Sequence, residues 1–233
     1  MSDEASAKEF EYHSVAVYRE KYAVLAKFYI NKEGQEARLF ADVVDRKCLD
    51  VPIDAYLIMI NPGSCRKKDA PVPVSEYYKN FDVVEAASDP AQKCVMAFMD
   101  LCGIKKIRIL NLMDYKSGNY DKALKVAVDQ SIVESLFSQE RAKERKWLMA
   151  EKAPIIAAWG TDKRLADLKK QAVECLGYAN IIGVKPDKEK ADYDFEYIKP
   201  PTKDAQIERI LDLAKCFEQR TGWNSAGFRI CTK

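Results

Sequence analysis

Histidine is nearly absent from this chain: His13 is the only one among 233 residues. A lone histidine near the start nearly excludes a histidine-based zinc site, a Ser-His-Asp triad and a Cys-His pair. The seven cysteines are scattered and include no Cys-x-x-Cys pair, so we expect free thiols in a chain without an export signal. We therefore expect no metal and no cofactor, and any chemistry here must run without histidine.

The sequence also lacks a long apolar run and an excess of charge. No apolar stretch reaches the roughly 18 residues that a membrane span needs, and the acidic start MSDEAS does not resemble a signal peptide. We therefore expect a cytoplasmic protein without a membrane partner. The 38 basic and 36 acidic residues leave a net charge of +2, which argues neither for nor against nucleic acid. The composition indicates no particular oligomeric state.

The length predicts one large domain over residues 1–233, in which residues 1–50 are appended to an α/β core over residues 51–233. In the first part, β-rich runs cover Tyr12–Tyr18, Tyr22–Ile30 and Ala37–Val44, with turn formers before the last of them. We expect these runs to form an antiparallel meander at the edge of the core sheet.

The core contains short apolar runs that alternate with helical patterns, which is typical of βαβ units. The expected strands are Ala55–Ile60, Lys106–Leu112, Ile155–Trp159 and Ala179–Val184. They predict a three-layer α/β/α fold with a mainly parallel, four-stranded central sheet. The main helices are expected from Pro90 to Gly103, over Ser131 to about Lys152, over Asp162–Gly177 and over Ala205–Thr221.

Polar or aromatic residues follow three of these strands where each one ends. Right-handed crossovers place the carboxyl ends of parallel strands at one edge of the sheet, where α/β proteins bind ligands. We expect one cleft there, lined by Asn61, Pro62, Gly63, Ser64, Asn111, Asp114, Trp159 and Gly160. Gly63 should take a positive φ in a Pro-Gly turn. The local alternative is a tight turn without chemistry.

Three further features lie close to this edge in the sequence. The loop Cys65–Phe81 begins with the basic residues Arg66, Lys67 and Lys68 and ends with Tyr77, Tyr78 and Phe81. It is either a cover that contacts phosphates and bases or a solvated loop. Asp89, between Ser88 and Pro90, is either a helix cap or a ligand contact. The helix that follows should aim its N-terminus at the cleft as an anion site. Asp114 is either a base or a structural carboxylate.

The segments LIMINPGS, SDPAQKCVMAFMDLCGIKKIRILNL and IIAAWGTDKRL resemble a bacterial family of unknown function, domain-of-unknown-function family 1643. The pattern of that family is roughly LNPS-x-A, DDPT-x-R, VVNL and AWG. The resemblance covers about Tyr12 to Pro201, with the segments in the same order and at similar spacing.

That family is in turn similar in layout to the uracil-DNA glycosylase superfamily, whose thymine- and mismatch-specific branch carries GINPG on its first core strand. Carried over, Asn61 would position the attacking water, Asn111 would read the edge of the base, and Trp159-Gly160 would mainly shape a turn. The glycosylases also use a late HPS or NPSG loop. The nearest segments here, Lys185-Pro186-Asp187 and Lys199-Pro200-Pro201, match it poorly.

The resemblance implies a glycosylase-like protein that binds a nucleobase, nucleotide or nucleic acid and hydrolyses an N-glycosidic bond with Asn61. Such hydrolysis suits a site without histidine, because the bond breaks largely dissociatively and the protein mainly holds the reacting groups in register. The alternative is a non-catalytic binding module for a small anionic ligand or a protein partner on the same fold.

Overall fold

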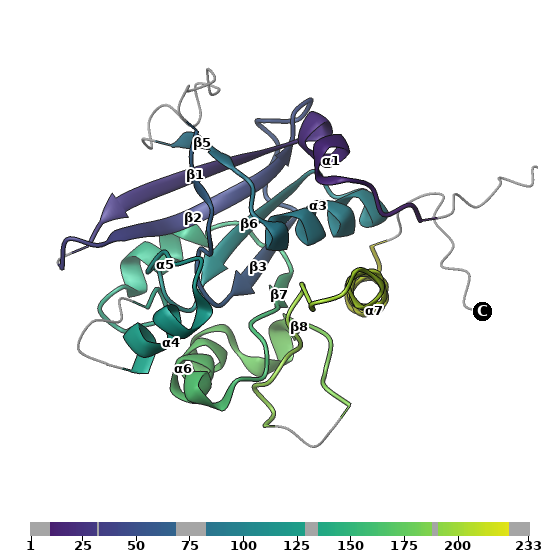
Figure 1. The fold of residues 1–233 in the computed structure, drawn as a ribbon. Coiled ribbons are helices and arrows are strands. Elements are labelled where there is room, and N and C mark those ends of the chain that lie inside the picture. The colour runs from purple at the N-terminus through teal and green to yellow at the C-terminus, as the bar shows by residue number, and fades with distance from the viewer. Residues whose placement is uncertain (1–9, 32, 69–82, 129–134, 188–190, 224–233) are drawn as a thin grey trace, which may run out of the picture.

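The computed structural model describes residues 10–31, 33–68, 83–128, 135–187 and 191–223. Its centre is one mixed eight-stranded sheet in the order β4-β5-β1-β2-β6-β3-β7-β8 (Figure 1). The strands are β1 (Tyr22–Ile30), β2 (Glu36–Asp45), β3 (Ala55–Met59), β4 (Arg66–Lys67), β5 (Val84–Ala87), β6 (Lys106–Asn111), β7 (Ile155–Ala157) and β8 (Ile181–Ile182). The predicted α/β class is confirmed, and the sheet has more strands and a more mixed order than predicted.

The strands β6, β3, β7 and β8 are neighbours and run parallel. Each of the four apolar runs expected in the core contributes one of them. All five residues of β3 and all six of β6 are buried, as expected for strands that are covered on both faces. The last strand is shorter than its apolar run because Tyr178–Asn180 forms a 3₁₀ turn, η2, before it.

The other half of the sheet is antiparallel. β1 pairs with β2 on one side and with β5 on the other, and β2 joins this half to β6. The strand predicted over Tyr12–Tyr18 is wrong, because Val15–Lys21 forms the helix α1. Ser14 caps this helix by accepting a hydrogen bond from the amide of Val17, and Tyr18 is buried against the sheet. The cap and one buried aromatic outweigh the β-propensity of the run.

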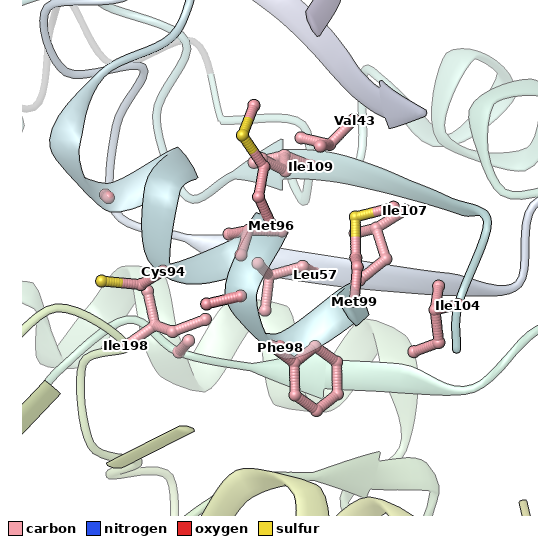
Figure 2. Packing of buried hydrophobic residues seen from close by; sticks show 14 of the residues in the cluster. Val43, Leu57, Cys94, Met96, Phe98, Met99, Ile104, Ile107, Ile109 and Ile198 are labelled. Carbon is pink, nitrogen blue, oxygen red and sulfur yellow. The ribbon is translucent and has the colours of Figure 1, made fainter. Parts of the chain in front are cut away.

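Helices cover both faces of the sheet (Figure 1). The described helices are α1, α3 (Pro90–Cys102), α4 (Tyr120–Val128), α5 (Ala142–Leu148), α6 (Ala166–Leu176) and α7 (Lys203–Thr221), with the 3₁₀ turn η1 (Lys163–Leu165) before α6. α1, α3 and α7 pack on one face, and α4, α5 and α6 on the other. Figure 2 shows Met96 and Met99 of α3 over Ile109, Ile107 and Leu57 of the parallel strands.

The helix expected over Ser131 to about Lys152 is shorter in the structure. Residues 129–134 lie outside the described part, and turns precede α5. The guanidinium of Arg145 donates to the carbonyl oxygens of Leu136 and Ser138, both at 2.9 Å, so these turn carbonyls are satisfied without a helix. None of the described helices has the length and apolar character that crossing a bilayer requires.

The sheet has a topological switch point between β3 and β7. From β3 the chain passes through α3 on one face to β6, and from β7 it passes through α6 on the opposite face to β8. The loops after β3 and β7 therefore diverge at their carboxyl ends. Open α/β sheets bind their ligands at such points.

Candidate functional site at the switch point

The switch-point site is the group of turns and side chains at the carboxyl ends of β3, β6 and β7. Its first part is the turn that follows β3. Asn61, Pro62 and Gly63 leave this strand, and Gly63 has a φ of 62°, the positive value that the Pro-Gly pair predicts. Gly160 follows β7 with a φ of 76°. A Cβ atom on Gly160 would lie 3.9 Å from Cδ1 of Ile60, so the two turns lie side by side at this edge.

Arg38 of β2 lies beneath this turn and connects two of the predicted site residues. Its Nη2 donates to Oδ1 of Asn111 at 2.9 Å, and its Nη1 donates to the carbonyl oxygen of Pro62 at 3.4 Å. The side chain is buried, with only 2% of its surface exposed. One guanidinium thus holds the end of β6 next to the turn after β3. Sequence reasoning missed Arg38, although a single arginine within the apolar run of β2 is the signal that could have found it.

The two asparagines predicted for the site differ in their access to solvent. Asn61 is half-buried, and its Nδ2 donates to the carbonyl oxygen of Ser117 at 2.8 Å. That bond fixes the amide so that Oδ1 is the atom left to accept from a water or a ligand. Asn111 is buried under Arg38, and its Nδ2 has no hydrogen-bond partner among the described residues. An unpaired buried donor is costly and therefore unusual.

Asp89 both caps α3 and faces the turn. Its Oδ1 accepts from the amide of Gln92 at 2.9 Å, and Oε1 of Gln92 accepts from the amide of Asp89 at 2.9 Å, which forms a capping box. The predicted cap is confirmed. A Cβ atom on Gly63 would lie 2.7 Å from Oδ2 of Asp89, so the helix start directly adjoins the turn. The carboxylate of Asp89 already accepts the hydrogen bond of a first-turn amide. The N-terminus of α3 is therefore not the vacant anion site that was predicted.

The acidity of Asp89 reflects this position. Burial raises the pKa of its carboxyl above the ordinary value, and the hydrogen bond from Gln92 and the charge of Arg38 offset only part of that rise. The charge of Lys199 acts in the same direction as that of Arg38. Asp89 therefore lies among two cations and a buried turn, which is an environment found at functional sites as well as in structural networks.

Asp114, predicted as a base or a structural carboxylate, has its partners elsewhere. Its Oδ2 accepts from the hydroxyl of Tyr29 at 2.8 Å and from Nη1 of Arg141 at 2.7 Å. These partners lie on β1 and just before α5. Burial raises the pKa of Asp114 to about 7, because the charge of Arg141 and the hydrogen bonds only partly offset the loss of water. These contacts favour the structural alternative for Asp114.

The Asp114–Arg141 pair yields a pH-dependent prediction. An aspartate in the unfolded chain ionises near pH 4, whereas Asp114 in the folded chain ionises near 7, so ionisation costs stability as the pH rises through that window. We expect Arg141→Met to lower the free energy of unfolding by about 2 kcal/mol at about pH 8, because it leaves a buried carboxylate without its cation. At about pH 5.5 the loss should shrink, since Asp114 is then protonated in both proteins.

Urea denaturation at the two pH values measures this loss. Glu144→Gln is the matched control, since it removes the other carboxylate that pairs with Arg141, at a partly exposed position. It should change the stability by less than about 0.5 kcal/mol. A loss in Arg141→Met that is equal at both pH values, or larger at the lower one, contradicts the assignment.

Trp159 belongs to the core, and its neighbour Gly160 lies at the site. The indole is fully buried, donates from Nε1 to the carbonyl oxygen of Tyr193 at 2.9 Å and meets the ring of Phe195 edge-on. A Cβ atom on Gly160 would lie 3.7 Å from Cβ of Tyr197. Trp159 therefore anchors the segment that follows β8. Of these two residues, only Gly160 belongs to the site, and it contributes its backbone.

The basic residues after the turn lie on a strand. Arg66 and Lys67 form β4, are exposed and pair with β5 at the end of the sheet, so this part of the expected loop is instead regular structure. Nζ of Lys67 lies 5.9 Å from the ring centre of Phe28, and Nζ of Lys116 lies 6.0 Å from it. Lys68 instead pairs with buried Glu85 at 2.5 Å.

The remaining predicted residues fall in different places. Ser64 is exposed and lies against Gly118, on which a Cβ atom would approach the Cβ of Ser64 to 3.3 Å. Tyr77, Tyr78 and Phe81 lie outside the described residues. A surface hollow described in the structure lies away from these strand ends and is lined by the α7 residues Asp204, Ile207, Glu208, Leu211, Asp212 and Lys215.

Sequence reasoning also missed Tyr197, which the structure places next to Gly160. Burial raises the pKa of its phenol, the charge of Asp89 raises it further, and Arg38 opposes the rise. The phenol thus lies within electrostatic reach of both groups. Its only sequence signal was its place just before Lys199-Pro200-Pro201, one of the segments compared with the late glycosylase loop.

No group of three or more His, Cys, Asp or Glu side chains is arranged to hold a metal ion in the described part of the chain. Comparison with models of known protein families gave no match for this chain, and a search of curated protein sequences gave none either.

Proposed function

We propose that this chain is a uracil-DNA glycosylase-like protein that binds a nucleobase, a nucleotide or nucleic acid at the switch-point site. The observation that carries the proposal is the guanidinium of Arg38, which bonds both to Asn111 and to the Asn61-Pro62-Gly63 turn. The resemblance assigns these two strand ends to the same ligand. The four parallel strands between helices on both faces support the glycosylase-like, three-layer core that belongs to the same proposal.

The reaction proposed for this site is hydrolysis of an N-glycosidic bond. Oδ1 of Asn61 would orient a water molecule, whose oxygen bonds to C1′ of the sugar as the C1′–N bond breaks. The electron pair of that bond goes to the base, and the proton lost by the water ends on the base. A fixed cation such as Arg38 near the leaving base would stabilise the negative charge that develops there. These roles need no histidine.

A specific observation favours the second candidate, a non-catalytic module that binds a small anionic ligand. Arg38 is a buried cation, Lys199 adds a second positive charge near Asp89, and an amide such as that of Asn61 is a poor base. Such a site would hold an anion and leave its bonds intact. The same strand ends would then serve for recognition alone, and a protein partner could supply the anionic group.

Incubation with oligonucleotides separates the two candidates. Purified protein is mixed with single- and double-stranded DNA that carries uracil, mismatched thymine or hypoxanthine, and abasic sites are scored. We expect abasic sites with the wild type and a loss of at least about 100-fold in Asn61→Ala, which is the lower end of the effect of losing a positioned group that acts on the nucleophile.

Asn180→Ala is the matched control for this assay. Asn180 is exposed, and its Nδ2 also donates to a backbone carbonyl, that of Leu176 at 3.0 Å, but it precedes β8 at the opposite edge of the sheet. Its loss should leave the rate unchanged. Cleavage that persists in Asn61→Ala removes Asn61 from the mechanism. Absence of cleavage and of salt-sensitive binding favours the binding module, because phosphate contacts give a steep salt dependence.

A further inference from the structure

The segment over residues 191–199, here called the strap, crosses the carboxyl edge of the sheet and is fixed along its length. Two side chains of the core hold it: Nε1 of Trp159 donates to the carbonyl oxygen of Tyr193 at 2.9 Å, and Lys169 forms an ion pair with Asp194 at 2.5 Å. Two backbone contacts follow. Gly160 forms a β-bridge with Phe195, and the amide of Glu196 donates to the carbonyl oxygen of Val184 at 2.8 Å. The strap is therefore a rigid element, although it has no helix or strand of its own.

The Lys169–Asp194 anchor is buried, and the residue that follows Tyr197 packs in the core as well. Lys169 is fully buried and Asp194 nearly so, which leaves little freedom for either side chain. Ile198, the residue after Tyr197, is also buried and packs in the cluster under α3 (Figure 2). The backbone on both sides of Tyr197 is thus held against the core, and its ring is placed before any ligand arrives. Pre-organisation of this kind is what a precise binding residue requires.

The hydroxyl of Tyr197 is uncommitted. It makes no hydrogen bond to any described residue, and the side chain is only partly buried. A phenol that no described residue engages, next to a ligand site, is able to donate its hydroxyl to a ligand. Gly160 lies beside it and leaves room because it has no side chain, and the charges of Asp89 and Arg38 lie within electrostatic reach.

Asp89 supplies the complementary group. Its Oδ1 accepts from the amide of Gln92 in the cap of α3, the amide of Ala91 also bonds to the carboxylate, and Oδ2 faces Gly63. Asp89 and Tyr197 are close enough for the charge of one to act on the other, yet they form no hydrogen bond with each other. The site therefore presents a phenol donor that no described residue uses and a carboxylate whose Oδ2 faces the turn after β3.

We propose that Tyr197 is the ligand-contacting residue that the strap contributes to the switch-point site, with its hydroxyl as donor and Oδ2 of Asp89 as the neighbouring acceptor. The inference rests on the proposed function, and it adds a contact from the strap to those that the strand ends supply. It also gives the anchors of the strap a purpose beyond stability, since they fix the position of one phenol.

Binding measurements on conservative variants test this inference. Titration calorimetry with uracil, thymine and hypoxanthine as free bases, and with the single-stranded oligonucleotides that contain them, is run on the full chain. Tyr197→Phe removes the hydroxyl and keeps the ring, so we expect affinity for the bound probe to fall about five- to tenfold, as for one lost hydrogen bond. The midpoint of thermal unfolding should stay the same, which a merely structural role of the hydroxyl would not allow.

Two more variants complete the test. Tyr178→Phe is the matched control, because Tyr178 is exposed at the opposite edge of the sheet, and it should bind as the wild type does. Asp89→Asn keeps a good helix cap but replaces an acceptor by an amide, so it should weaken binding without unfolding α3. If the wild type binds and Tyr197→Phe binds equally well, the inference is overturned and the proposed function stands. If the wild type binds no probe, both are overturned.

Discussion

Replacing Arg38 with methionine is expected to lower the free energy of unfolding by about 3 kcal/mol and to abolish ligand binding. Methionine fills much of the space of the buried side chain but cannot donate to Asn111 or to Pro62. Oδ1 of Asn111 then joins its Nδ2 as a buried polar atom without a partner. The turn after β3 also loses the contact that holds it next to the end of β6.

Urea denaturation followed by circular dichroism measures this loss. Arg164→Met is the control, because Arg164 is exposed and pairs with Asp162 at the surface. Surface pairs contribute little, so the control should change stability by less than about 1 kcal/mol. An equally small change in Arg38→Met would show that the guanidinium is not the structural centre of the site.

The second large effect is expected for Lys169→Met, with a loss of about 3–5 kcal/mol in the free energy of unfolding. The ammonium of Lys169 and the carboxylate of Asp194 are both buried, with Nζ 2.5 Å from Oδ1. Methionine is unbranched like lysine and only one heavy atom shorter, so the change removes the charge and leaves little cavity. The carboxylate that remains would be buried without a cation, and the strap would lose one of its buried anchors.

The double variant Lys169→Met/Asp194→Leu separates the cost of the unpaired charge from the value of the pair. Replacing both charged partners by apolar groups usually restores most of the stability that one replacement removes. We expect the double variant to recover at least about half of the loss, as measured in the same urea titrations. Additive losses in the two single variants would contradict a direct pair between these residues.

Local signals in the sequence predicted the parts of the fold that local interactions determine. The continuous apolar runs gave β3 and β6 because strands covered on both faces need no polar alternation. Asp89 was predicted as a cap because a capping residue followed by proline marks a helix start. The positive φ of Gly63 followed from the Pro-Gly pair. Each depends on a few neighbouring residues.

The rest of the site depends on contacts between residues far apart in the sequence. Arg38 and Asn111 are 73 residues apart, and only the pairing of β2 with β6 brings them together. Tyr197 reaches the site because the strap is fixed by Trp159 and Lys169, neither of which signals a ligand. α1 was missed because its cap competes with a β-rich pattern of similar strength. Local propensity cannot determine such outcomes.

The most direct test of the central claim is a map of where a nucleobase touches the protein. A single-stranded oligonucleotide carrying 5-bromouracil is bound to the full chain, irradiated and digested with a protease, and the cross-linked peptides are identified. The account predicts cross-links in residues 61–64 and 197–199, at the carboxyl edge of the parallel strands. Cross-links confined to residues 178–180 at the opposite edge, or to the outward side of α7, would contradict it, as would their complete absence.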